Sequence, residues 1–102
     1  MKRVIKASSV STSQCSFDFD LGHSYNANYI EDEICGRMDD LGYEVTGVDF
    51  HAVDYPEGKQ YSQCSFDFRW WGSYDADAIE NTLIDLIDDE GGNFLGIDFY
   101  GM

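Results

Sequence analysis

The sequence repeats itself after 49 residues, and this repeat limits the folds that the chain can adopt. The run Gln14–Phe19 recurs unchanged as Gln63–Phe68, and 17 of 40 positions are identical when residues 14–53 are aligned without a gap to residues 63–102. Chance does not explain this agreement, so we interpret the chain as two copies of one structural unit. At 102 residues the whole chain is expected to be one domain, with residues 54–62 as the hairpin between the copies.

Each copy begins with a strand pattern and continues with a helix pattern. In the strand, apolar residues alternate with polar ones, which is the period of a half-buried strand. In the helix, apolar residues recur every three or four positions, as one buried stripe requires. The inward strand positions are Cys15, Phe17, Phe19 and Leu21 in the first copy and Cys64, Phe66, Phe68 and Trp70 in the second. The helix stripes are Ala27, Ile30, Ile34, Met38 and Leu41, and Ala76, Ile79, Leu83 and Ile87.

Sequence signals mark the start and the end of both expected helices. A polar residue followed three positions later by glutamate matches the spacing of a capping box, and glycine is the usual residue just beyond a helix end. The capping-box pairs are Asn28–Glu31 and Asp77–Glu80, the alternative caps are Asn26 and Asp75, and the stops are Gly42 and Gly91–Gly92.

A second strand follows each helix, at Val45–Val53 and at Phe94–Tyr100. Gly47 and Gly96 shift the alternation at the same place in both strands, which predicts a matched β-bulge. The linker Tyr55–Lys59 holds proline and glycine as turns require, so it joins the copies as a hairpin. The resulting order predicts an α+β, ferredoxin-like fold: four antiparallel strands in the order 4-1-3-2 with both helices on one face.

The repeat also predicts how the two central strands pair. Under a pseudo-twofold axis the expected partners are Phe19–Phe68, Asp18–Arg69 and Asp20–Asp67. The second pair attracts and the third repels, so we interpret Arg69 as a residue that stabilises the sheet. Residues 1–13 have no strong counterpart; they either extend the first strand or add a short edge strand.

Charge narrows the possible partners of the chain. Twenty acidic residues and six basic ones give a formal charge of −14, while 43% of residues are hydrophobic and 16% are aromatic. This composition is typical of a folded acidic domain and not of a disordered tail. Binding to nucleic-acid phosphates or to an anionic membrane is excluded because both need basic patches. All acidic residues lie between Asp18 and Asp98, so residues 14–102, with twenty acids and three bases, carry −17.

The three cysteines are Cys15, Cys35 and Cys64. Their odd number and wide spacing fit neither a disulfide framework nor a zinc site. Cys15 and Cys64 can meet across a sheet, but buried thiols are the expected outcome. The start of the chain lacks a signal-peptide core and no apolar run reaches membrane-spanning length, so we expect reduced cysteines in a cytoplasmic protein.

The sheet face away from the helices is expected to be open and acidic. RNA-recognition modules of this topology place aromatic and basic residues there, whereas this chain places aspartates. The aspartates are spread over four strands, which disfavours a divalent-cation site, and paired-carboxylate catalysis lacks a cleft. His23 and His51 have no partner at ligand spacing, so we expect no enzyme activity, metal or cofactor. The outward residues are Ser16, Asp18, Asp20, Asp49, His51, Ser65, Asp67, Arg69, Asp98 and Tyr100.

Acidic residues also follow the outer face of each expected helix. At the end of the second helix, Asp88, Asp89 and Glu90 oppose the helix dipole, a placement that stability alone does not favour. Trp71 beside Tyr74 is expected to be an exposed aromatic anchor. The candidate partner-binding residues are Glu31, Asp32, Asp39, Asp40, Asp67, Trp71, Tyr74, Asp85, Asp88, Asp89, Glu90 and Asp98.

In size, acidity, repeated ferredoxin-like pattern and lack of a catalytic motif, the chain resembles phage-encoded anti-CRISPR proteins and related DNA-mimic antirestriction proteins. The resemblance implies an inhibitor that occupies the basic nucleic-acid-binding groove of a CRISPR effector or restriction enzyme in the host cytoplasm, with carboxylates in place of phosphates. Two alternatives remain. One is a regulatory or oligomerising ferredoxin-like domain that pairs through its sheet edges, and the other is a metal- or small-ligand-binding module.

Overall fold

The computed structural model describes residues 4–22, 25–54 and 60–101, which form strands and helices in the predicted order. The elements are β1 (Val4–Asp20), α1 (Ala27–Asp40), β2 (Glu44–Asp54), β3 (Gln60–Asp75), α2 (Ala76–Asp89) and β4 (Asn93–Gly101). The predicted turn at Tyr55–Lys59 and the candidate residue His23 lie outside the described residues.

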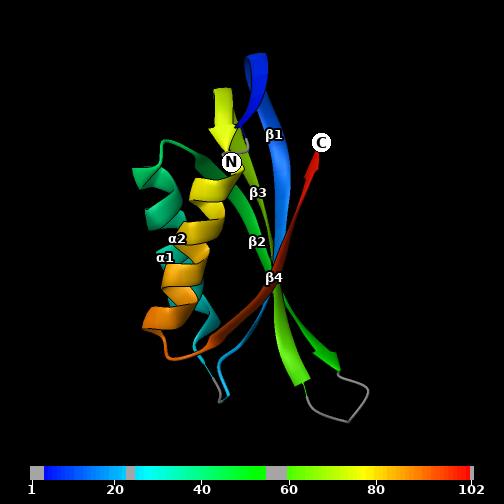
Figure 1. Cartoon of the computed structure of the whole chain (residues 1–102), viewed down its shortest axis with the longest axis vertical. Coiled ribbons are helices and arrows are strands. Elements are labelled where there is room, and N and C mark those ends of the chain that lie inside the picture. Colours follow the sequence, from blue (N-terminus) through cyan, green and yellow to red (C-terminus); the bar gives the residue numbers. More distant parts are fainter. Residues whose placement is uncertain (1–3, 23–24, 55–59, 102) are drawn as a thin grey trace.

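The four strands form one antiparallel sheet in the order β2-β3-β1-β4, and both helices cover the same face of it (Figure 1). This is the ferredoxin-like α+β arrangement that the sequence predicts. The two long strands β1 and β3 lie at the centre of the sheet, and β2 and β4 form its edges. Because β1 covers Val4–Asp20, residues 4–13 extend the first strand and do not form a separate edge strand.

The predicted pairing of β1 with β3 is wrong, because each residue pairs six positions away from its predicted partner. Ser16 pairs with Ser65 at the centre, Phe19 pairs with Ser62, and Phe68 pairs with Ser13. The length of β1 explains the difference, since the observed register brings its first residues beside the end of β3 at Asp75. The predicted register would leave those residues without a partner strand.

The pairs of charged residues predicted from that register are therefore wrong as well. Asp18 pairs with Gln63 and not with Arg69. Arg69 lies opposite Glu44 of β2, and its Nη1 is 3.2 Å from a carboxylate oxygen of that residue. Arg69 does join two strands, as predicted, but they are β2 and β3.

Each helix begins at the alternative cap and not at the capping box. The Asn26 side chain accepts hydrogen bonds from the backbone N–H groups of Asn28 and Tyr29, at 2.9 and 3.3 Å. The Asp75 side chain accepts one from Ala78 at 3.1 Å. Asn28 and Asp77 already lie inside the helices, so the capping-box prediction is wrong. The residue that caps is the one held extended just before the first turn.

The predicted glycine positions are confirmed at both helix ends and both bulges. Gly42 and Gly91 have φ of 92° and 80°, a left-handed conformation that glycine adopts without steric cost. The register of each edge strand shifts at the residue before a glycine, at Thr46 in β2 and at Leu95 in β4. The bulges therefore stand at matching places, directly before Gly47 and Gly96.

The core lies between the sheet and the helices. Phe17, Phe19, Phe66 and Phe68 from the central strands are fully buried, and the apolar stripes of both helices cover them. The indole N–H of Trp70 donates a hydrogen bond of 3.0 Å to the hydroxyl of Ser13, so the largest core side chain also has its polar atom satisfied.

Candidate binding surfaces

The candidate acidic residues fall on two opposite faces of the molecule. None of the acidic side chains that the structure describes is buried, which fits charges that meet solvent or a partner. Those on α1 and α2 or their ends form the helix layer, and those on the strands lie on the open face of the sheet (Figure 1). The helix layer holds Glu31, Asp32, Asp39, Asp40, Asp85, Asp88, Asp89 and Glu90, and the open face holds Asp67 and Asp98. One flat partner surface cannot contact both groups.

Ion pairs within the helix layer join the two helices. Arg37 of α1 has its Nη2 3.2 Å from Glu33 on the same helix and 3.2 Å from Asp89 of α2. Asp85 and Asp88 are exposed, and within the described part of the chain no arginine is paired with either. Of the acids on α2, Asp89 therefore has a structural role, whereas Asp85 and Asp88 face solvent.

Tyr29 is an exposed aromatic residue of the helix layer that sequence reasoning missed. Its side chain is 48% exposed on α1. The nearby carboxylates of Glu90 and Glu33 raise the pKa of its phenol above the ordinary 10.0. The signal for this site was present in the sequence, because Tyr29 lies off the apolar stripe of the helix.

The open face of the sheet carries a row of side chains that crosses all four strands. Asp49, Ser65, Ser16 and Asp98 are neighbours in register, and the hydroxyl of Ser65 lies 3.4 Å from that of Ser16. The side-chain amide of Gln63 donates a hydrogen bond of 3.1 Å to Asp18. Among the described residues there is no group of three or more histidine, cysteine or acidic side chains that could hold a metal ion.

The two predicted aromatic anchors behave differently. Trp71 is 51% exposed, as predicted, and the guanidinium of Arg69 lies 5.8 Å from its ring centroid. Tyr74 is only 5% exposed, so its prediction as an anchor is wrong. Because β3 continues to Asp75, its alternation carries Tyr74 to the same side as Trp70, where the two rings are 4.9 Å apart.

The cysteines are free thiols in two different environments. Cys15 and Cys64 are buried under the helices, and burial raises the pKa of both, that of Cys64 to about 12. Cys15 pairs with Phe66 and Cys64 with Phe17, which places the two cysteines diagonally across the strands. Cys35 of α1 is half-buried, and burial followed by the charges of Glu31 and Asp32 raises the pKa of its thiol.

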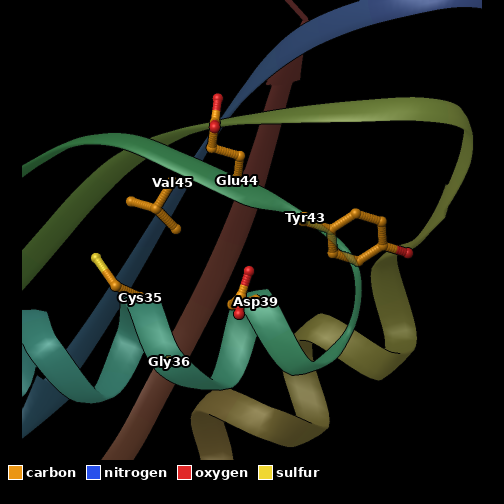
Figure 2. A pocket seen from close by; sticks show the side chains of 6 residues that line it. All are labelled: Cys35, Gly36, Asp39, Tyr43, Glu44 and Val45. Carbon is orange, nitrogen blue, oxygen red and sulfur yellow. The ribbon is translucent and has the colours of Figure 1, made fainter.

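A hollow of about 350 Å³ lies between α1 and the edge strand β2 and opens to solvent (Figure 2). It is lined by Cys35, Gly36, Asp39, Tyr43, Glu44 and Val45. Sequence reasoning did not find it, although Asp39 was among the candidate residues. The available signal was a difference in side-chain size, since the positions 49 residues after Cys35 and Val45 hold the larger Ile84 and Phe94.

No protein-family profile matches the sequence, and no curated protein matches it. Solved structures share the fold. The C-terminal domain of the MgtC protein from Mycobacterium tuberculosis matches with a TM-score of 0.59 and 11% identity over 96% of this chain and 94% of that one. The full extracellular region of zebrafish Gpr126/Adgrg6 matches with a TM-score of 0.63 and 10% identity over 95% of this chain and 14% of that one.

A third solved structure, an unknown protein from Galdieria sulphuraria, has a TM-score of 0.51 and 8% identity, and the match covers 96% of this chain and 53% of that one. This chain thus spans about half the length of the Galdieria protein and a small part of the zebrafish region. Likeness at these identities shows the fold alone. Neither helix in the described ranges, at 14 residues each, is long and apolar enough to cross a membrane.

Proposed function

We propose that this chain is an acidic protein inhibitor that occupies the basic nucleic-acid-binding groove of a phage-defence nuclease, either a CRISPR effector or a restriction enzyme. The observation that supports this function most directly is the exposure of Asp85 and Asp88 on α2, where no described arginine is paired with them. Carboxylates on a rigid helix substitute for phosphates and attract a basic surface over a distance. The inhibitor acts by occupation, without catalysis or a cofactor, in the cytoplasm where the nuclease works.

The end of α2 supports the same proposal on energetic grounds. Its last residues include Asp88 and Asp89, its C-cap is Glu90, and its last turn has no basic residue. Negative charge at a helix C-terminus opposes the helix dipole and destabilises the helix. The last turn of α1, by contrast, contains Arg37. We expect charges that are kept at such a cost to stability to serve a partner.

The helix layer is the proposed contact surface. On the open face, Asp18 already accepts a hydrogen bond from Gln63, and Arg69 adds positive charge beside Trp71. In the helix layer, the acids of two helices packed side by side form one surface, and Arg37 is held within it by Glu33 and Asp89. A basic groove therefore meets a more uniform negative charge on the helices than on the sheet.

The test is competition for DNA binding to a purified CRISPR effector and to a purified restriction enzyme. The double variant D85K/D88K reverses two solvent-facing charges and leaves Asp89 to hold Arg37. The matched control D49K/D98K makes the same change in net charge on the open face. We expect D85K/D88K to weaken inhibition more than about tenfold, the control to stay within about twofold, and inhibition by the unaltered chain to fall steeply with salt.

Three results would contradict this function: no inhibition of either enzyme, inhibition that is indifferent to salt, or equal losses in the two variants. Equal losses would mean that total charge, and not the helix layer, sets the interaction. The control is informative because Asp49 and Asp98 are both exposed and lie at the ends of one row across the sheet.

A second candidate function, self-association through a sheet edge, is favoured by one observation. The outer edge of β4 is not covered by another described strand, and Leu95 and Tyr100 of that strand are 45% and 50% exposed. Exposed edges of this kind pair with other strands. Light scattering that finds a dimer at micromolar concentration would favour this function, and a monomer would remove it.

A further inference from the structure

The hollow between α1 and β2 is lined by apolar surface and by the exposed carboxylate of Asp39. Figure 2 shows Cys35 of the helix and Val45 of the strand pointing toward each other, and Asp39 about one turn further along the same helix. Glu44 points away from α1, toward the open face where it meets Arg69. The volume of about 350 Å³ is near the small end of the range for ligand pockets, about 300–1,000 Å³.

The charge around the hollow is negative. Asp39 is exposed, and within the described residues no cationic side chain is paired with it. Glu31 and Asp32 lie about one turn before Cys35 on α1 and act electrostatically on its thiol, whose pKa burial raises first and these charges raise further. A group that enters between Cys35 and Val45 therefore meets apolar surface on its sides and the carboxylate of Asp39 at its end.

We propose that this hollow receives an arginine side chain of the basic partner. The aliphatic stem of arginine packs against Val45 and the ring of Tyr43, and the guanidinium reaches Asp39. Arginine fits this environment better than lysine because its guanidinium is more weakly hydrated and its planar fork matches a carboxylate. The inference rests on the proposed function for its partner, but the hollow is a separate site on the same surface.

The wall residues of the hollow are smaller than the residues at the matching positions of the second unit. The positions 49 residues after Cys35, Asp39 and Val45 are Ile84, Asp88 and Phe94. The second unit therefore has an aspartate at the matching position of α2, but larger residues in place of Cys35 and Val45. Of these, Phe94 packs against the core, with its ring centroid 5.9 Å from that of Phe17. This difference supplies matched control variants, since Asp88 is an exposed acid beside the larger residues of the second unit.

The experiment titrates the full chain with N-acetyl-L-arginine methylamide and follows backbone amide signals by NMR. The uncharged citrulline analogue is the control ligand. We expect saturable shifts at Cys35, Gly36 and Val45 with the arginine compound and none with the citrulline compound. Because a partly exposed ion pair contributes up to about 1 kcal/mol, D39N should weaken binding about fivefold, and D88N should leave it unchanged.

A second variant tests the shape of the hollow. C35I/V45F introduces the residues found at the matching positions of the second unit and should abolish the shift at Gly36. If C35I/V45F does not fold, the comparison of D39N with D88N decides the question alone. Equal weakening by D39N and D88N, or shifts confined to other parts of the chain, would overturn the inference.

The test separates this inference from the proposed function. If the unaltered chain inhibits a nuclease, and the D39N and C35I/V45F variants inhibit it equally well, the arginine site is overturned and the inhibitor proposal stands. Saturable binding of the arginine compound at the hollow, in a chain that inhibits neither enzyme, would support the site and contradict the inhibitor.

Discussion

The hydroxyl of Tyr43 accepts a hydrogen bond from the backbone N–H of Asp75 at 2.9 Å. Tyr43 stands just before β2, and Asp75 is the last residue of β3 and the cap of α2. This contact therefore ties the exit of the first helix to the entry of the second, across 32 residues of sequence. It also holds the Tyr43 ring at one end of the proposed arginine site.

Tyr43→Phe should destabilise the fold by about 1 kcal/mol, because it leaves a partly buried N–H without its acceptor. The measurement is chemical denaturation followed by circular dichroism. Tyr100→Phe is the control, since Tyr100 is half exposed and its substitution should change the unfolding free energy by less than about 0.5 kcal/mol. A Tyr43→Phe variant as stable as Tyr100→Phe would show that water replaces the hydroxyl.

Ser13→Ala should destabilise the fold more than the substitution of an exposed serine does. The Ser13 hydroxyl accepts the indole N–H of Trp70 in a buried site, so its loss leaves that N–H unpaired at a cost of about 1–3 kcal/mol. Ser73→Ala, at an exposed position of β3, provides the comparison. Thermal unfolding of both variants measures the difference in stability. Equal melting temperatures would mean that the indole N–H finds another acceptor.

Most of the fold was predictable because local periodicity carries it. Alternation along the strands and the three-to-four spacing in the helices predict the elements, and their order predicts the ferredoxin-like topology that the structure has. The register was not predictable from the repeat, since residues 4–13 have no counterpart and their pairing moves the centre to Ser16 and Ser65. The choice of capping residue was likewise not predictable from the sequence. Of two nearby polar residues, the one that caps the helix is the last one in extended conformation.

The candidate surfaces were predictable only in part. Charge and periodicity correctly place the helix acids and Trp71 at the surface. The length of β3 decides the burial of Tyr74, and that length depends on pairing with β1. The hollow depends on the sizes of Cys35 and Val45 on two elements that face each other, a relation that no single stretch of sequence contains.

The thiols should react in two phases with Ellman's reagent. Cys35 is half-buried and should react first, whereas Cys15 and Cys64 are buried and should react only when the chain opens. Cys35→Ser should therefore remove the fast phase alone. No Cys15–Cys64 disulfide should form, because diagonal positions hold their side chains about 7 Å apart and a disulfide needs about 4 Å between Cβ atoms. A cross-linked peptide after mild oxidation of the folded chain would contradict this prediction.

Stability should fall as the pH rises above about 9. Burial raises the pKa of Cys64 from 9.0 to about 12, and raises that of Cys15 as well. Below pH 9 both folded and unfolded chains keep these protons, so the thiols add no pH dependence there. Between pH 9 and 12 the unfolded chain loses protons that the folded chain retains, which favours unfolding.

Cys64→Ala should therefore flatten the decline of unfolding free energy between pH 9 and pH 11, and Cys35→Ala should change that slope much less because Cys35 is only half-buried. Denaturant titrations at several pH values give the slopes. The comparison uses slopes and not absolute stabilities, because removal of a buried sulfur also leaves a small cavity. Identical slopes in the two variants would show that Cys64 does not couple to alkaline unfolding.

Removal of a negative charge should change the stability of the fold in opposite directions at the two ends of α2. Asp77 lies in the first turn, where negative charge is favourable, and Asp88 lies in the last turn, where it is unfavourable. Asp88→Asn should therefore raise the unfolding free energy by about 0.3–1 kcal/mol, and Asp77→Asn should lower it. Both effects should shrink in high salt, which screens the helix dipole.

The same pair of variants also tests whether the acids at the end of α2 serve a partner. If they do, Asp88→Asn gains stability and weakens inhibition of the nuclease, whereas Asp77→Asn loses stability and leaves inhibition unchanged. Denaturation and DNA-competition assays on the same two proteins give both quantities. An Asp88→Asn variant that is more stable and inhibits equally well would mean that the charge at this position is not kept for binding.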